Sequence, residues 1–164
     1  MALDYDLSSI HEARDLAKKA KEAQLKFAEF SEAENKRVLA AMAKAAEDNA
    51  ELLAKMAVDE TKFGKVEDKV TKNIFAARDV YEYIKDMQVL GVVREDKVRK
   101  VVEMGVPMGV LMGILPSTNP TSTTIYKALV SLKAGNGIVF SPHPGAARCS
   151  YAAAQILHDA AVKA

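Results

Sequence analysis

The sequence lacks the features of several large classes of protein. It contains a single cysteine, Cys149, so no disulfide can form within the chain and a thiolate metal cluster is not expected. It has no apolar run of about eighteen residues, the length that a bilayer requires. Its first thirty residues alternate charged with apolar positions, so no signal peptide is expected either. These absences predict a cytoplasmic protein without a membrane partner.

An excess of charge of one sign is also lacking. The 164 residues include 23 Lys and Arg against 22 Asp and Glu, and 49% of them are hydrophobic. This balance is typical of soluble globular proteins and indicates no nucleic-acid partner. The three histidines are isolated in the sequence and give no pattern of metal ligands, so we expect no metal. The length suits one domain of ordinary size.

Charge is distributed unevenly along the chain. Between Glu103 and Arg148 the only formally charged side chains are Lys127 and Lys133, whereas the first hundred residues carry nearly all the others. We therefore divide the chain into a helical region at residues 1–91, a short β excursion at residues 92–108 and an α/β region at residues 109–164.

Three helices are predicted in the first region. The first begins at Ser9, where Ser9 and Glu12 have the spacing of a capping box. The second begins at Ser31 with the same device and continues to Gly64, and the third covers residues 66–86. We interpret the many Lys and Glu residues of these helices as solvated faces.

The later sequence predicts strands that alternate with helices. Residues 98–104 and 106–115 are predicted to form strands, and the run 109–115 lacks polar alternation, as expected for a parallel strand covered on both faces. A helix over 121–134, a strand over 137–140 and a helix over 146–164 follow. This order predicts a parallel crossover, in which the loops 116–120 and 141–144 line one crevice beyond the carboxyl ends of the strands.

The loop after the first of these strands is rich in hydrogen-bonding groups. Residues 116–124 place hydroxyls and an amide between a strand and a helix start, where free backbone amides suit phosphate or ribose oxygens. An ordinary helix cap explains the same residues. The glycine-rich dinucleotide fingerprint is absent, because Gly109 and Gly113 lie within the strand.

Two motifs carry a family resemblance. The runs GILPSTNPTST at residues 113–123 and IVFSPHP at 138–144 resemble the coenzyme A-acylating branch of the aldehyde dehydrogenase superfamily, including the aldehyde half of bifunctional aldehyde-alcohol dehydrogenases. The similarity extends through KMAVDE at 55–60 and VEDKV at 66–70, and so covers nearly the whole chain. It implies an α/β fold: amino-terminal helices followed by the first half of a doubly wound, Rossmann-like cofactor domain.

The resemblance also implies a reaction and a set of contacts. The reaction converts a short aldehyde, NAD and the co-substrate coenzyme A reversibly to acyl-coenzyme A and NADH, in a homo-oligomer. Ser141 stands where most non-acylating relatives have a lysine, which leaves the preference between NAD and NADP open. The residues that the resemblance places against the cofactor are Ile114, Leu115, Pro116, Ser117, Thr118, Asn119, Ser141, Pro142 and His143.

Catalytic residues are harder to assign. Aligning the flanking prolines with non-acylating relatives puts Thr118 at their oxyanion-binding Asn position, so either Thr118 or Asn119 could contact the oxyanion. The family's nucleophilic cysteine falls beyond residue 164, and Cys149 is interpreted as a small buried thiol. His143 is assigned a loop-shaping or cofactor-edge role.

The chain is accordingly expected to be an amino-terminal fragment of such an enzyme, inactive alone. The alternatives are a naturally short, non-catalytic binding or assembly module of the same family and, less favoured by the two motifs, a relative of glutamyl-phosphate reductase.

Overall fold

The computed structural model describes residues 4–164 and confirms the α/β class. Its elements, in chain order, are α1 Tyr5–Phe27, α2 Glu32–Asp48, α3 Ala50–Thr61, α4 Val66–Ile74, the π-helical turn η1 Phe75–Asp79, α5 Val80–Ile84, β1 Gly91–Asp96, β2 Val101–Gly105, β3 Val110–Leu115, α6 Pro120–Lys133, β4 Gly137–Pro142, the 3-10 turn η2 Pro144–Ala146 and α7 Ala147–Lys163.

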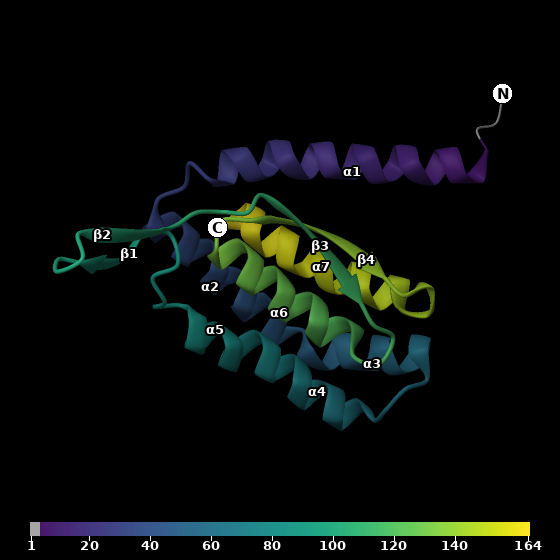
Figure 1. The fold of residues 1–164 in the computed structure, drawn as a ribbon. Helices are drawn as coiled ribbons and strands as arrows, with labels where there is room; N and C mark the ends of the chain where they lie inside the picture. Colours follow the sequence, from purple (N-terminus) through teal and green to yellow (C-terminus); the bar gives the residue numbers. More distant parts are fainter. Residues whose placement is uncertain (1–3) are drawn as a thin grey trace.

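The predicted parallel crossover is confirmed. β3 and β4 pair in parallel, with Val110 opposite Gly137 and Leu115 opposite Pro142, and α6 connects them. The helix ends where predicted, because Gly135 adopts a φ of 70° that favours glycine and its N–H bonds the Leu132 carbonyl at 2.9 Å. In Figure 1, α6 and α7 lie beside this two-stranded sheet.

One hydrophobic core joins the helical region to the α/β region. Fully buried side chains come from α2, α3 and α6, and examples are Leu39, Leu53 and Leu129. Leu157 of α7 belongs to the same cluster. The early helices therefore pack directly on the crossover helix, and this packing positions the site described below.

The two predicted capping boxes have different outcomes. At α2, the Glu34 N–H donates to Ser31 Oγ at 3.3 Å and the Ser31 N–H donates to the Glu34 carboxylate at 2.8 Å, as predicted. The prediction at Ser9 is wrong, because α1 begins at Tyr5 and the Ser9 hydroxyl donates to the Tyr5 carbonyl inside the helix. A serine can bond back to the preceding turn as readily as it caps.

The second predicted helix is also wrong in its length. It breaks at Asn49, which has a φ of −105° and a ψ of 12° and separates α2 from α3. The Asn49 amide donates to the Ala45 carbonyl at 2.8 Å, so a local bond compensates for the interrupted helix. Apolar spacing could not show this break, because α2 and α3 both bury residues in the shared core.

The predicted strands near residue 100 are shifted. β1 and β2 form an antiparallel hairpin that projects from the helices in Figure 1. The prediction of a strand over 98–104 is wrong at its start, since the Asp96 carboxylate accepts the N–H groups of Val98 and Arg99 and shapes a turn there. The strand predicted over 106–115 begins only at Val110.

The expectation that β3 is covered on both faces is wrong for the described chain. Gly113 and Leu115 are buried, but Met112 and Ile114 are 70% and 64% exposed. α1 lies against the sheet, and its Gln24 side-chain amide donates to the Gly135 carbonyl just before β4 at 3.1 Å, but it leaves Met112 and Ile114 exposed. Burial of this face depends on tertiary neighbours, which a run of apolar residues does not specify.

We expect Asn73→Ala to destabilise the fold. The Asn73 side chain is fully buried, donates to the Ala50 carbonyl at 3.0 Å and accepts from the Thr121 hydroxyl at 2.8 Å. Its loss leaves buried partners unpaired and should lower the free energy of unfolding by about 1–3 kcal/mol in urea denaturation. The exposed Thr71→Ala is the control and should change it by less than about 0.5 kcal/mol. Equal effects would contradict this role.

Candidate functional site

The two loops singled out in the sequence lie at the same end of the sheet. Residues 116–119 follow β3, but the loop predicted at 141–144 is wrong at its start, because Ser141 and Pro142 are the last residues of β4 and pair with Ile114 and Leu115. The His143 N–H donates to the Leu115 carbonyl at 2.9 Å, which joins the two segments. Among the predicted cofactor residues, Leu115 is buried with its backbone, and its carbonyl already accepts a hydrogen bond. Ser117, Asn119 and Pro142 are half-buried, and the exposed ones are Ile114, Pro116, Thr118, Ser141 and His143.

One face of α4 holds the first loop. The Lys69 ammonium donates to the Thr118 carbonyl at 2.7 Å, and the Lys72 ammonium donates to Asn119 Oδ1 at 3.0 Å. Asn73, one residue further, holds Thr121. The spacing of 69, 72 and 73 places these side chains on one side of the helix.

Lys69 corrects the interpretation of the helical lysines as solvated. Only 4% of the Lys69 surface is exposed. Burial, together with the charge of Lys72, lowers the pKa of the Lys69 ammonium. The sequence analysis did not identify these α4 residues, although polar side chains at 69, 72 and 73 stand beside the apolar Val70 and Ile74.

A groove lies between α4, η1 and α6. It has a volume of about 610 Å³, and it is lined by Thr71, Lys72, Phe75, Ala76, Val80, Asn119, Ser122, Thr123 and Tyr126. The π-helical turn begins at Phe75, whose side chain is 60% exposed at this groove. Such turns are frequent at functional sites. The groove is apolar over most of its wall, and its polar lining residues are Thr71, Lys72, Asn119, Ser122 and Thr123.

The structure distinguishes Asn119 from Thr118. Asn119 lines the groove, and its side chain makes no cap bond to α6 although it stands at the N-cap position. No hydrogen bond of its Nδ2 occurs within residues 4–164, so this donor is free in the described part of the chain. Thr118 is exposed and contributes its carbonyl to Lys69. Of these two residues, Asn119 is therefore the one whose side chain can donate to an atom in the groove.

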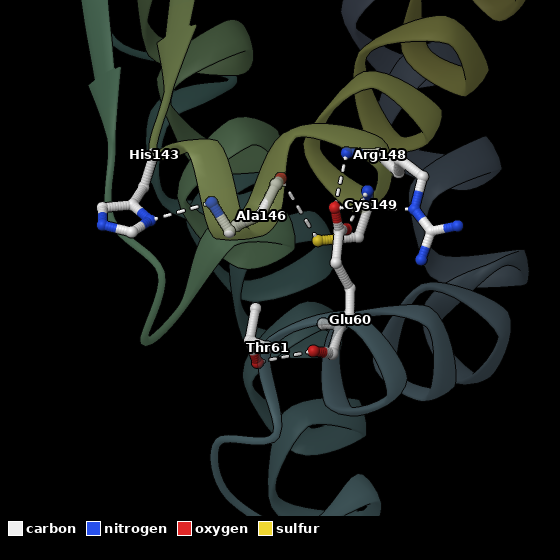
Figure 2. Close-up of polar contacts among 8 residues, drawn as sticks. Glu60, Thr61, His143, Ala146, Arg148 and Cys149 are labelled. Carbon is white, nitrogen blue, oxygen red and sulfur yellow. Dashed lines mark hydrogen bonds and ion pairs between the residues drawn. The ribbon is translucent and has the colours of Figure 1, made fainter.

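The amino terminus of α7 is closed by a carboxylate from α3 (Figure 2). Glu60 accepts the N–H of Arg148 at 2.9 Å and the N–H of Cys149 at 2.7 Å. Burial alone would raise the pKa of Glu60, but these bonds outweigh it and the pKa is lowered. A helix amino terminus often binds phosphate. Here its amides already have an anionic partner.

Cys149 is the small buried thiol that the sequence predicted. It is fully buried, and its Sγ donates to the Ala146 carbonyl at 3.4 Å. Burial, reinforced by the Glu60 carboxylate, raises the pKa of Cys149 to about 12. A thiol must ionise to act as a nucleophile. Cys149 therefore has the wrong environment for that role.

His143 shapes its own loop. Its Nδ1 accepts the Gly145 N–H at 3.1 Å, as Figure 2 shows, and its carbonyl accepts the Ala146 N–H at 2.8 Å.

Within residues 4–164 no helix is long and apolar enough to cross a bilayer. The same residues contain no group of three or more His, Cys, Asp or Glu side chains that could hold a metal ion.

Known proteins resemble the chain throughout. The family model described as "Aldehyde dehydrogenase family" matches residues 3–164. The bifunctional aldehyde-alcohol dehydrogenase AdhE of Escherichia coli is 42% identical over 158 residues, which are 96% of this chain and 18% of that protein. The crystal structure of an acetylating aldehyde dehydrogenase from Geobacillus thermoglucosidasius matches with a TM-score of 0.94 and 49% identity, over 99% of this chain and 36% of that one. The chain thus spans about a fifth of the curated relative.

We expect Glu60→Gln to destabilise the protein in a pH-dependent way. Above the ordinary carboxyl pKa of 4.5 the ionised Glu60 caps α7, and the substitution should lower the free energy of unfolding by about 1.5–3 kcal/mol. Because the folded pKa is lowered, this stabilisation is lost as pH falls from 4.5 through the folded value, where the two proteins converge. Urea denaturation between neutral and acid pH measures the difference. The exposed neighbour Asp59→Asn is the control, and a difference independent of pH would contradict the assignment.

Proposed function

The chain belongs to the aldehyde dehydrogenase family, among its acylating members, and from this premise we propose that it serves the coenzyme A-dependent oxidation of an aldehyde. In that reaction an aldehyde, NAD and the thiol of coenzyme A give an acyl-coenzyme A thioester, NADH and a proton. Short aliphatic aldehydes are the proposed substrates. The whole protein is proposed to act as a homo-oligomer.

The cofactor is proposed to lie across the two loops at the carboxyl end of the sheet. When bound, NAD supplies the acceptor for the hydride of the aldehyde. Exposed Pro116 and Thr118 after β3, and exposed Ser141 and His143 at the end of β4, include no carboxylate or ammonium and suit ribose and ring groups. The phosphates are not expected at the amino terminus of α7, because Glu60 occupies its amides.

The aldehyde is proposed to approach through the groove between α4 and α6. Its wall of Phe75, Ala76 and Val80 suits an aliphatic chain, and Asn119 provides a donor for the oxygen of the carbonyl group. Negative charge develops on that oxygen when a thiolate attacks the carbon. Asn119, rather than Thr118, is thus the proposed oxyanion contact.

The nucleophile is proposed to come from residues outside these 164. Cys149 is the chain's only cysteine, and its burial and raised pKa keep it protonated at neutral pH. The thiolate that attacks the aldehyde therefore requires another segment. We also propose that residues 109–164 form the first half of the cofactor domain. The helices of residues 1–91 and the β excursion of residues 92–108 are proposed to pack beside it.

The position of Asn119 gives the proposal its main support. The residue stands at the end of the cofactor loop and at the same time in the wall of the apolar groove. A donor that borders both surfaces can bind the oxygen of a carbonyl group. The carbon of that group must meet both a hydride acceptor and a nucleophile.

Asn119→Ala tests this assignment in the protein at its full encoded length. With acetaldehyde, NAD and coenzyme A, we expect kcat for NADH formation to fall by about a hundredfold, as when one oxyanion donor is removed. Thr118→Ala keeps the carbonyl that Lys69 contacts and should alter KM for NAD more than kcat. Unchanged kcat in Asn119→Ala would remove the residue from the site, and a wild-type protein without coenzyme A-dependent NADH formation would refute the proposed function.

Cys149→Ala provides the complementary test. The variant should retain the wild-type rate of acyl-coenzyme A formation, because a buried thiol of raised pKa does not attack the aldehyde. Coupled detection of NADH and the thioester in the same full-length protein measures this rate. Loss of activity in a variant that keeps the wild-type unfolding free energy would show that Cys149 is the nucleophile.

A further inference from the structure

We propose that Lys72 is a positioning residue that fixes the orientation of the Asn119 side-chain amide. The Lys72 Nζ lies 3.0 Å from Asn119 Oδ1 and links α4 to the start of α6. The inference rests on the proposed function, in which Asn119 contacts the carbonyl oxygen of the aldehyde.

The chemistry of the two groups determines which way the amide faces. An ammonium has three donors and no acceptor, whereas an amide has an acceptor oxygen and a donor nitrogen. The amide atom next to Lys72 must therefore be Oδ1, and Nδ2 becomes the free end. Without Lys72 the amide can rotate by a half turn and present its oxygen, which repels the negative oxygen that develops in the reaction.

The neighbours of Asn119 are held by the same helix. The Lys69 ammonium bonds the carbonyl of the residue before it, and Asn73 bonds the hydroxyl of Thr121 two residues after it. The backbone on both sides of Asn119 is thus fixed independently of Lys72. The contribution left to Lys72 is the rotation of one side chain.

Charge adds to this effect. Lys72 forms no ion pair with a carboxylate within residues 4–164, so its positive charge is not neutralised in the described part of the chain. It also lines the groove together with Asn119. An unpaired ammonium behind the amide polarises the N–H bonds that face the reacting oxygen.

An orienting role and a structural role predict different effects when Lys72 is removed. Lys72 is exposed and bonds only a half-buried side chain, so its removal should leave the urea midpoint within error of wild type. Its removal should instead affect the chemical step. This separates an orienting role from a structural one such as that of Asn73.

The test compares Lys72→Met, Lys72→Arg and Asn119→Ala in the full-length protein. The matched control is Lys65→Met, an exposed lysine at the N-cap of α4. We expect Lys72→Met to lower kcat by about tenfold with KM for NAD unchanged, which is less than loss of the donor itself. Lys72→Arg, which still donates to Oδ1, should restore most of kcat, and Lys65→Met should match wild type.

The double variant Lys72→Met with Asn119→Ala shows whether the two residues act together. If Lys72 acts through Asn119, the double variant is no slower than Asn119→Ala alone. Independent, multiplying losses would overturn the positioning role, as would a wild-type kcat in Lys72→Met. If Asn119→Ala itself keeps wild-type kcat, the oxyanion assignment fails, and this outcome is distinguishable from failure of Lys72 alone.

Discussion

Three polar side chains on one face of α4 hold the loop between β3 and α6, and the geometry of the candidate site depends on them. Lys69 bonds a loop carbonyl, Lys72 bonds the Asn119 side chain and Asn73 bonds Thr121. Asn73 also bonds the first residue of α3, so the loop is tied to the helical core. A change in how α3, α4 and α6 pack would therefore move the groups that we propose to face cofactor and aldehyde.

Much of the fold could be predicted because its signals are local. The capping box of Ser31 and Glu34 and the stop at Gly135 each specify a helix end by their own chemistry. The start of α1 at Tyr5 instead of Ser9 and the break at Asn49 could not be predicted in the same way, because serine and asparagine have similar local bonds inside helices and at their ends. The exposure of Met112 depends on neighbours distant in sequence.

The site was predictable in part. The two loops follow from the order of strands and helices, and the buried character of Cys149 follows from its small neighbours on a helix. The contacts of Lys69 and Lys72 with the loop were not predicted, because a lysine on an amphipathic helix is usually solvated. Sequence periodicity does not show that Lys69 reaches a carbonyl 49 positions away. The same limit applies to Glu60, whose partners at α7 lie in another part of the chain.

We propose that the segments at the ends of β3 and β4 hold the cofactor beside Asn119 while Glu60 stays bonded to the amino terminus of α7. A crystal structure of the full-length protein with NAD bound tests it most directly. We expect the nicotinamide end near Asn119, the adenosine end near Ser141 and His143, and Glu60 still bonded to the amides of α7. Cofactor phosphates on those amides, with Glu60 displaced, would contradict it.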